Sequence, residues 1–535
     1  MTDKPFRTGK RYRPGRLKDN YDAIVIGSGI GGLTTAACLA RDGRRVLVLE
    51  QHYTAGGMTH TYERHGYEWD VGLHYVGDMN DASTSARRLF DYISDGSLEW
   101  APMDAHFDRI FLGQQQYDLV AGSEAYKAEL LRRFPAEQAA LDSYFAAMQK
   151  VRQGISLLAV EKALPGWAGW LVRLIRHASQ GRYFRQTTRQ VLESMTDNQT
   201  LIAVLCGQWG DCGMPPAESS FVIHSMIARH YMQGASYPVG GSARLADSII
   251  PVIEAAGGDV FTYADVAEIL VEQQRAAGVR MVDGTTIRAP LVISNAGAFN
   301  TFTRLLPAAQ HCPADSRRLA QVQRSPACLC LYIGLQDSAE NLGLPKSNLW
   351  IYPGEHYEQQ IARFEADPSA EIPLVYISFP SAKDPDFARR HPGRATIEII
   401  APGPFDWFAD WQDSQWGQRG DDYLALKAHW SGRLLAVLYQ HLPQLQGKVD
   451  YHELSTALSN AHFCRYAQGE IYGLQHDPAR FEQHWLKPAT RIPGLYLTGQ
   501  DVMSCGIVGA AVGGVLCAAA IDGFKGMKLV KRLLA

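Results

Sequence analysis

The residues best placed to do chemistry form a Gly-x-Gly-x-x-Gly pattern near the N-terminus, from Gly27 to Gly32. An expected strand, 22–26, with the apolar run 23–26, precedes them, and an apolar helical pattern begins at Leu33. A second expected strand, 45–49, leads into Glu50. Strand, glycine turn, helix, strand and acid in this order are typical of a dinucleotide-binding unit. The sequence therefore predicts a nucleotide cofactor at this turn.

Each position of the motif has an expected role. Gly27 allows the tight turn, Gly29 lets the backbone approach a pyrophosphate, and Gly32 lets the helix pack closely on the strand. Glu50 would accept hydrogen bonds from a ribose, and its charge would repel a 2′-phosphate. The amide groups at the N-terminus of the helix favour phosphates, which adds Ile30 and Gly31 to the expected site. The alternative is a plain strand–helix–strand unit with a glycine turn.

A second glycine pair, Gly56 and Gly57, would let the chain pass close to the cofactor again. The run 50–77, EQHYTAGGMTHTYERHGYEWDVGLHYVG, resembles the flavoprotein superfamily of phytoene desaturases and carotenoid isomerases, and is most similar to its retinol saturases (all-trans-retinol 13,14-reductases). In these proteins the glycine motif binds FAD. The resemblance thus implies FAD and adds Gln51 and Met58 to the expected site.

The resemblance extends over residues 21–520 and is strongest at 46–80, 373–412 and 494–515. It departs after the paired glycines, where Met58, Thr59 and His60 stand in place of the saturases' cysteines, so the activity here could differ.

Further cofactor residues are implied by the resemblance. Gly72 would allow backbone contact with the flavin ring, Val266 would pair its backbone with the adenine, and Asp501 would bind the ribityl or phosphate side. A small-residue helix from Gly506 would direct its positive end at the flavin and stabilise its reduced anion, although an apolar core helix is the alternative. The other implied positions are His74, Asn295, Ala296, Gly499, Ile507 and Val508.

The resemblance implies saturation of a carbon–carbon double bond in a retinoid, carotenoid or similar conjugated apolar lipid, by hydride transfer from reduced flavin. The proton would come from water or from one of three side chains, those of His74, Tyr75 and Tyr472. For His74 and Tyr75, the alternative is a purely structural role. The alternatives are a carotenoid desaturase, a redox-neutral carotenoid isomerase, and a non-catalytic lipid or prenyl carrier of the GDP-dissociation-inhibitor type. The electron donor is left open because a second dinucleotide motif is lacking in the sequence.

We expect an α/β fold, with a Rossmann-type FAD-binding domain assembled from discontinuous segments, a mixed α+β substrate domain and a candidate membrane-contact helix. The three expected parts of the FAD-binding domain are 21–84, 236–300 and 486–520. Between them we expect a helical substrate and membrane-contact segment (85–235) and a substrate sheet with its connections (301–485). A basic flexible arm (1–20) and a basic amphipathic tail (521–535) would form the two ends.

The segment 164–185 combines apolar and basic residues in a helical pattern. One face would carry Trp167, Trp170, Leu171, Leu174 and Ile175, with Arg173 and Arg176 opposite. This favours a helix lying in a membrane surface, with a core-packed amphipathic helix as the alternative. The tail could be a second membrane contact or a frayed end.

Composition excludes some classes of protein. The net charge of −3 over 535 residues argues against a nucleic-acid binder. Nine scattered cysteines lack metal-site spacing, so we expect no metal and reduced thiols in a cytoplasmic compartment. We expect neither a signal peptide nor a spanning helix, and place the protein peripherally on a membrane surface.

Overall fold

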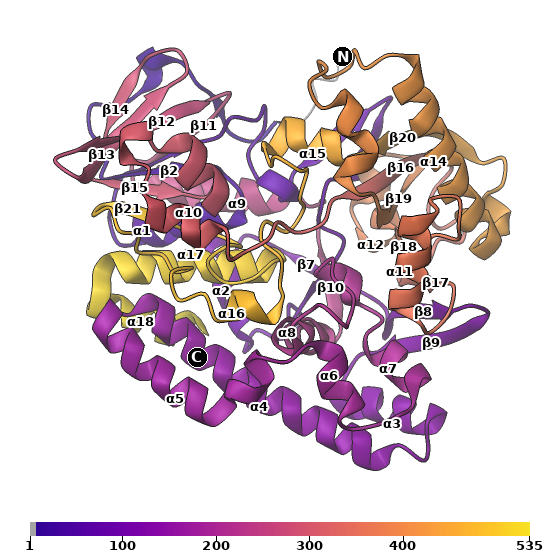
Figure 1. The fold of residues 1–535 in the computed structure, drawn as a ribbon. Helices are drawn as coiled ribbons and strands as arrows, with labels where there is room; N and C mark the ends of the chain where they lie inside the picture. Colours follow the sequence, from indigo (N-terminus) through magenta and orange to yellow (C-terminus); the bar gives the residue numbers. More distant parts are fainter. Residues whose placement is uncertain (1–6, 535) are drawn as a thin grey trace.

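The computed structural model of the protein describes residues 7–534. A six-stranded parallel sheet collects its strands from distant parts of the chain (Figure 1). The two central strands of the motif are fully buried, which is why each is an unbroken apolar run. In spatial order the strands are β1 (Lys10–Arg11), β11 (Asp259–Thr262), β3 (Val46–Leu49), β2 (Ala23–Ile26), β15 (Leu291–Ser294) and β21 (Leu495–Leu497).

Helix α1 (Ile30–Arg41) packs against α9 (Arg244–Ala255) and α17 (Ile507–Asp522) beside this sheet. The small residues of α17 allow close contact, since a Cβ at Gly514 would lie 2.6 Å from the carbonyl oxygen of Gly31. By length and composition alone, the segment Ile507–Leu534 is long and apolar enough to cross a membrane, a candidate that the sequence analysis did not identify. Most of α17 is nevertheless buried against protein, as in the core helix of a globular fold.

A second, larger sheet has seven strands. Strands β8 and β17 pair in parallel, and the other neighbours pair antiparallel. The order is β20 (Val449–Ser455), β16 (Cys328–Gln336), β19 (Arg394–Pro402), β18 (Val375–Ser378), β17 (Asn348–Tyr352), β8 (His106–Leu112) and β9 (Gln115–Val120). The prediction of a helical segment over 85–235 is wrong at β8 and β9, which alternate buried and more exposed residues and complete this sheet.

Three smaller sheets complete the strand content of the described residues. They consist of β12 (Val266–Glu272), β13 (Arg275–Met281) and β14 (Thr286–Arg288); of β6 (Val76–Gly77), β10 (Ala235–Pro238) and β7 (Trp100–Pro102); and of the hairpin β4 (Thr61–Arg64) and β5 (Tyr67–Asp70).

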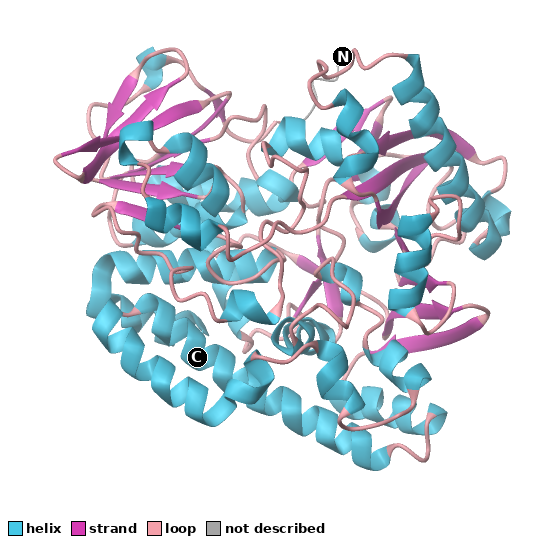
Figure 2. Ribbon diagram, viewed as in Figure 1, coloured by secondary structure: helices cyan, strands magenta, loops and turns pink. Residues whose placement is uncertain are grey.

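Helices form a layer below both sheets, as Figures 1 and 2 show. This layer contains α3 (Ser123–Arg133), α4 (Gln138–Ala163), α5 (Gly166–Phe184), α6 (Thr188–Glu193), α7 (Gln199–Leu205) and α8 (Phe221–Tyr231). The remaining helices are α2 (Ser85–Ser94), α10 (Pro313–Leu319), α11 (Tyr357–Ala366), α12 (Pro380–Lys383), α13 (Phe387–Arg390), α14 (Asp421–His441), α15 (Ala457–Cys464), α16 (Pro478–Phe481) and α18 (Met527–Leu534).

The basic N-terminal segment is not a flexible arm where it is described. Lys10 and Arg11 pair with β11 as an edge strand, and Lys18 Nζ lies 2.9 Å from Asp259 Oδ2. Lys10 and Lys18 of this segment thus form ion pairs with acidic side chains of the six-stranded sheet and its neighbouring helix α9. Residues 1–6 of the predicted arm lie outside the described residues.

The C-terminal tail is a helix, α18, and not a frayed end. Val530 and Leu533 are buried, and α18 packs on α2 and α4. The apolar face that we considered for membrane contact therefore covers protein.

Helix α5 leaves an apolar face uncovered. Trp167 is 68% exposed and Ile175 is 59% exposed, and the ring of Trp167 lies 5.9 Å from that of Phe524, which is also exposed. Trp170, Leu171 and Leu174 extend this face. The expectation for Arg176 is wrong, because its side chain is fully buried and its Nη2 lies 3.0 Å from Glu161 Oε2.

Candidate active site

Two glycine loops meet at the carboxyl ends of β2 and β3. Gly27 has a φ of +95°, and Gly29 forms an isolated parallel bridge with Gly56. A Cβ on Gly57 would lie 2.8 Å from the Cα of Gly29. Side chains are excluded here, so the loops present main-chain groups to the cavity beside them. We call residues 27–31 with Gly56 and Gly57 the glycine cradle.

Two further loops, one after β15 and one after β21, close against the cradle. A Cβ on Gly31 would lie 2.4 Å from the Cα of Gly499, and a Cβ on Gly499 would lie 2.3 Å from Asn295 Oδ1. Asp501 is buried, and its Oδ2 accepts a hydrogen bond of 2.7 Å from the amide of Ala298. Segments almost 500 residues apart in sequence thus form one wall.

Glu50 is held in place by the cradle. Its Oε2 accepts hydrogen bonds from the amide (2.8 Å) and hydroxyl (2.7 Å) of Ser28, and its Oε1 accepts one from the amide of His52 (2.8 Å). The same Ser28 hydroxyl accepts a hydrogen bond from the amide of Gly56. The carboxylate therefore lies fixed in the cavity wall.

Most of the residues predicted from sequence line this one cavity. They are Gly27, Gly29, Ile30, Gly31, Glu50, Gln51, Gly56, Gly57, Met58, Gly72, His74, Val266, Asn295, Ala296, Asp501, Gly506, Ile507 and Tyr472.

Four predicted residues do not line the cavity. Gly32 packs the helix, since its Cβ would lie 2.2 Å from the carbonyl oxygen of Gly27. Gly499 lies behind Asn295, and Val508 packs against the apolar core beside α1. Tyr75 is buried away from the cavity.

The strand β16 supplies a wall that motif analysis missed. Cys328, Cys330 and Tyr332 line the cavity at every second position, together with Ile400 of β19. In a strand, successive side chains point to opposite faces, and this alternation was the available signal in the sequence. It does not reveal which of the two faces lines a cofactor cavity. Burial raises the pKa of Cys328 to about 12, so its thiol is neutral.

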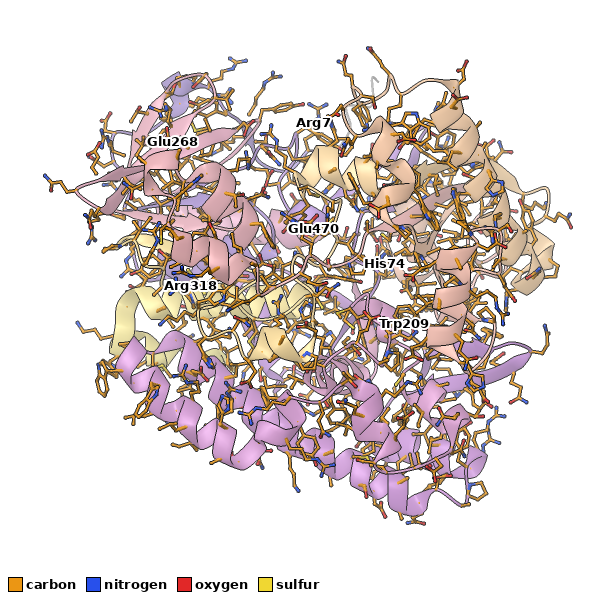
Figure 3. All side chains as sticks on the ribbon, in the orientation of Figure 1. Arg7, His74, Trp209, Glu268, Arg318 and Glu470 are labelled. Atoms are coloured by element: carbon orange, nitrogen blue, oxygen red, sulfur yellow. The ribbon has the colours of Figure 1, made fainter. Side chains whose placement is uncertain are left out.

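The second missed feature is Glu398 of β19, whose side chain contacts that of His74, a residue labelled in Figure 3. His74 Nδ1 lies 2.8 Å from Glu398 Oε2, and the amide of Asp70 donates to Glu398 Oε1 at 2.8 Å. Glu398 is fully buried, which raises its pKa to about 8. Burial, and then the charge of Lys383, lowers the pKa of His74 to about 3.

Lys383 completes this arrangement. Its Nζ donates to the carbonyl oxygen of His74 (2.9 Å), to the Ser378 hydroxyl (2.8 Å) and to Asn348 Oδ1. Burial lowers the pKa of Lys383 to about 7. We call His74, Asp70, Lys383 and Glu398 the polar cluster. Lys383 lies in the short polar run 381–385 (SAKDP), and no motif in the sequence marked it as part of a site.

Tyr75 and Tyr472 have different surroundings. The Tyr75 hydroxyl donates to Asp108 (3.0 Å) and lies 3.1 Å from Asp211 Oδ2. The Tyr472 ring lines the cavity, but its hydroxyl donates to the carbonyl oxygen of Gly210 (3.2 Å). Of the three predicted proton donors, His74 is therefore the one that both lines the cavity and contacts a buried acid, Glu398.

A model of the family described as "Flavin containing amine oxidoreductase" matches residues 30–400. The chain belongs to this family. It is 37% identical to a zebrafish (Danio rerio) all-trans-retinol 13,14-reductase, over 97% of this chain and 89% of the relative. It is 26% identical to a chloroplastic prolycopene isomerase of Arabidopsis thaliana, over 96% of this chain and 84% of the relative. The solved structure of a putrescine oxidase shares the fold, with a TM-score of 0.60, 15% identity and coverage of 94% and 98%.

Membership of the flavin-containing amine oxidoreductase family makes this chain a flavin-dependent oxidoreductase. The residues present fit a flavin nucleotide. The glycine cradle leaves room that a Cβ would fill, and the N-terminus of α17 at Gly506 and Ile507 lines the same cavity. That helix end favours negative charge on a ligand beside it.

Proposed function

We propose that this protein is an FAD-dependent oxidoreductase that saturates a carbon–carbon double bond of a retinoid or a similar conjugated apolar lipid. The observation that carries this proposal is the 37% identity to a retinol 13,14-reductase over 97% of the chain. A match of this length includes the glycine cradle, the polar cluster and the wall from β16.

In this proposal, FAD supplies the hydride for one carbon of the double bond. The cradle amides bind the pyrophosphate, and Glu50 binds a ribose. Asp501 orients the loop beside the flavin through its hydrogen bond to Ala298. Cys328, Tyr332 and Ile400 provide a largely apolar wall along which a polyene can lie.

The polar cluster supplies the proton for the second carbon. At neutral pH Glu398 is largely protonated and His74 is uncharged. The Glu398 carboxyl can donate to His74 Nδ1, which leaves the proton of His74 on Nε2. Transfer of that proton to the substrate, coupled to transfer of the Glu398 proton to Nδ1, leaves a neutral imidazole and a Glu398 carboxylate, which takes up a proton from water before the next turnover. His74 is the proposed catalytic acid, and Glu398 its proton reservoir.

The test is anaerobic. The purified protein is reduced with dithionite and given all-trans-retinol, and the product is weighed by mass spectrometry. A gain of two hydrogens together with reoxidation of the flavin supports the proposal. Unchanged product mass with retinol and with a short carotenoid contradicts it, and a new isomer of unchanged mass supports the isomerase alternative.

The isomerase is the second candidate because a prolycopene isomerase matches the chain over nearly its full length. It requires reduced flavin without net consumption, so flavin reoxidation distinguishes the two functions. The desaturase is tested by giving the oxidised protein a saturated product and measuring a loss of two hydrogens. A carrier would bind lipid without changing its mass.

We further propose that the exposed face of α5 contacts a membrane, with the protein bound peripherally on the cytoplasmic side. Exposed Trp167, Trp170 and Leu174 are apolar groups of the kind that insert at a bilayer interface. A lipid substrate would partition into the same bilayer. We expect the native protein to sediment with phosphatidylcholine vesicles and the W167A/F524A variant to lose this binding. Equal binding by both proteins would contradict the proposed contact.

A further inference from the structure

Beneath the N-terminal half of α5 lies a small cavity separate from the flavin site. Its walls come from α4, α5 and the loop that follows α16. Lys162, Arg173 and Lys487 line it, and Trp170 of the exposed face lines it too. The cavity is therefore continuous with the apolar surface that we propose for membrane contact.

Positive charge in this cavity exceeds the negative charge. Glu161 is the acid in its wall, and it is already engaged by buried Arg176 (3.0 Å) and by His484 (3.5 Å). Among the residues that the structure describes, neither Arg173 nor Lys487 forms an ion pair. Two cations thus face the cavity without an acidic partner.

Lys162 adds a third basic group. Its Nζ donates to the carbonyl oxygen of Leu486, which is a neutral acceptor. Burial lowers the pKa of Lys162 to about 7, and the nearby charges of Arg480, Arg176 and Lys487 contribute to that shift. An anion in the cavity would relieve this repulsion and favour the charged lysine.

The start of α5 faces the same cations. Gly166 opens the helix after Pro165, and a Cβ on Gly166 would lie 3.8 Å from Lys487 Nζ. The free amide groups at a helix N-terminus favour anions, as the unpaired cations do. Figure 1 shows α5 at the outer edge of the helical layer, far from the seven-stranded sheet.

We propose that this cavity binds the phosphate of an anionic phospholipid headgroup while the adjacent face of α5 inserts among the acyl chains. The inference rests on the proposed membrane contact but not on the reaction. Lys162, Arg173 and Lys487 would hold the phosphate, and Trp170 would lie at the boundary between headgroup and apolar region. The site would orient the protein on the bilayer that supplies its lipid substrate.

The test compares two variants of the full-length protein that each remove two positive charges. R173Q/K487Q alters the cavity, and K346Q/K448Q alters the region of the seven-stranded sheet. Binding is measured by co-sedimentation with phosphatidylcholine vesicles, with and without phosphatidylglycerol. We expect R173Q/K487Q to lose about tenfold or more in affinity for the anionic vesicles, and the control to lose less than about threefold. Both should bind neutral vesicles like the native protein.

Equal losses by the two variants would overturn the headgroup site, because bulk charge would then explain the preference. Titration with inorganic phosphate provides a second arm. Phosphate binding without a preference for anionic vesicles would also overturn the lipid assignment and indicate a site for a free anion. Retinol saturation in detergent, measured in parallel, tests the proposed reaction separately, and W167A/F524A tests the membrane contact.

Discussion

The glycine cradle presents main-chain amides to the cavity, whereas His74, another of its lining residues, presents a side chain backed by buried ionisable groups. The cradle excludes side chains by close contact of its loops. The polar cluster depends instead on which side chains lie behind His74 and on the protons they hold. Substitutions should therefore affect cofactor binding in the first region and proton transfer in the second.

The largest expected effect is that of E398Q on turnover. Glutamine keeps the size of Glu398 but cannot act as the proposed reservoir, so the rate of retinol saturation should fall roughly 10²–10⁴-fold. Flavin content should remain unchanged. The measurement is single-turnover oxidation of prereduced protein by retinol. E365Q, at an exposed position of α11, serves as the control. Native turnover in E398Q would refute the proposed relay.

In the cradle, G57A should release flavin. Gly57 has a φ of +57°, and the added Cβ would lie 2.8 Å from the Cα of Gly29. Strain of about 1–3 kcal/mol in the bound conformation predicts roughly 10- to 100-fold weaker flavin binding. The measurement is the flavin absorbance that each purified protein retains per mole of protein.

The control for G57A is G96A. Gly96 also has a positive φ, of +71°, but open space surrounds it. Equal flavin loss in G96A would mean that strain alone, rather than the cradle, controls binding.

A third prediction concerns pH. The folded protein keeps a proton on Glu398 up to about pH 8, whereas the unfolded chain releases it above about pH 4.5. Stability from this group is thus present at low pH and is lost as pH rises through about 8. The free energy of unfolding of the native protein, relative to E398Q, should fall by on the order of 1–3 kcal/mol between pH 5 and pH 8. Urea unfolding at both pH values measures this difference. A difference that does not change with pH would show that Glu398 is ionised in the fold.

The smallest effect on turnover is expected for Y75F. Tyr75 does not line the cavity, so the rate of saturation should change by less than about threefold. Asp108 would lose the hydrogen bond that the Tyr75 hydroxyl donates, which predicts a loss of about 1–2 kcal/mol in the free energy of unfolding. Urea unfolding and turnover are measured on the same preparation. A large loss of turnover with unchanged stability would return Tyr75 to the list of catalytic candidates.

The cradle was predictable because its requirements are local. Gly27, Gly29 and Glu50 lie within one strand–helix–strand unit, whose turn dictates residue types at set spacings. The strands over 328–336, 375–378 and 394–402 were also predictable from apolar runs bounded by turns. Predictions failed where the partner was remote. The basic segment at Lys10 and Arg11 has the composition of a solvated arm, and its pairing with β11 cannot be read from that composition.

The sequence by itself determined the dinucleotide unit, the flavin family and the apolar face of α5, because each is a pattern of residue types at short spacing. Tertiary structure alone decided that Glu398 lies against His74, 324 residues away, and that Lys383 reaches the main chain of His74. It also decided that Arg176 is buried while Arg173 faces a cavity. Contacts and burial between distant segments set the protonation of these groups, and no local pattern records them.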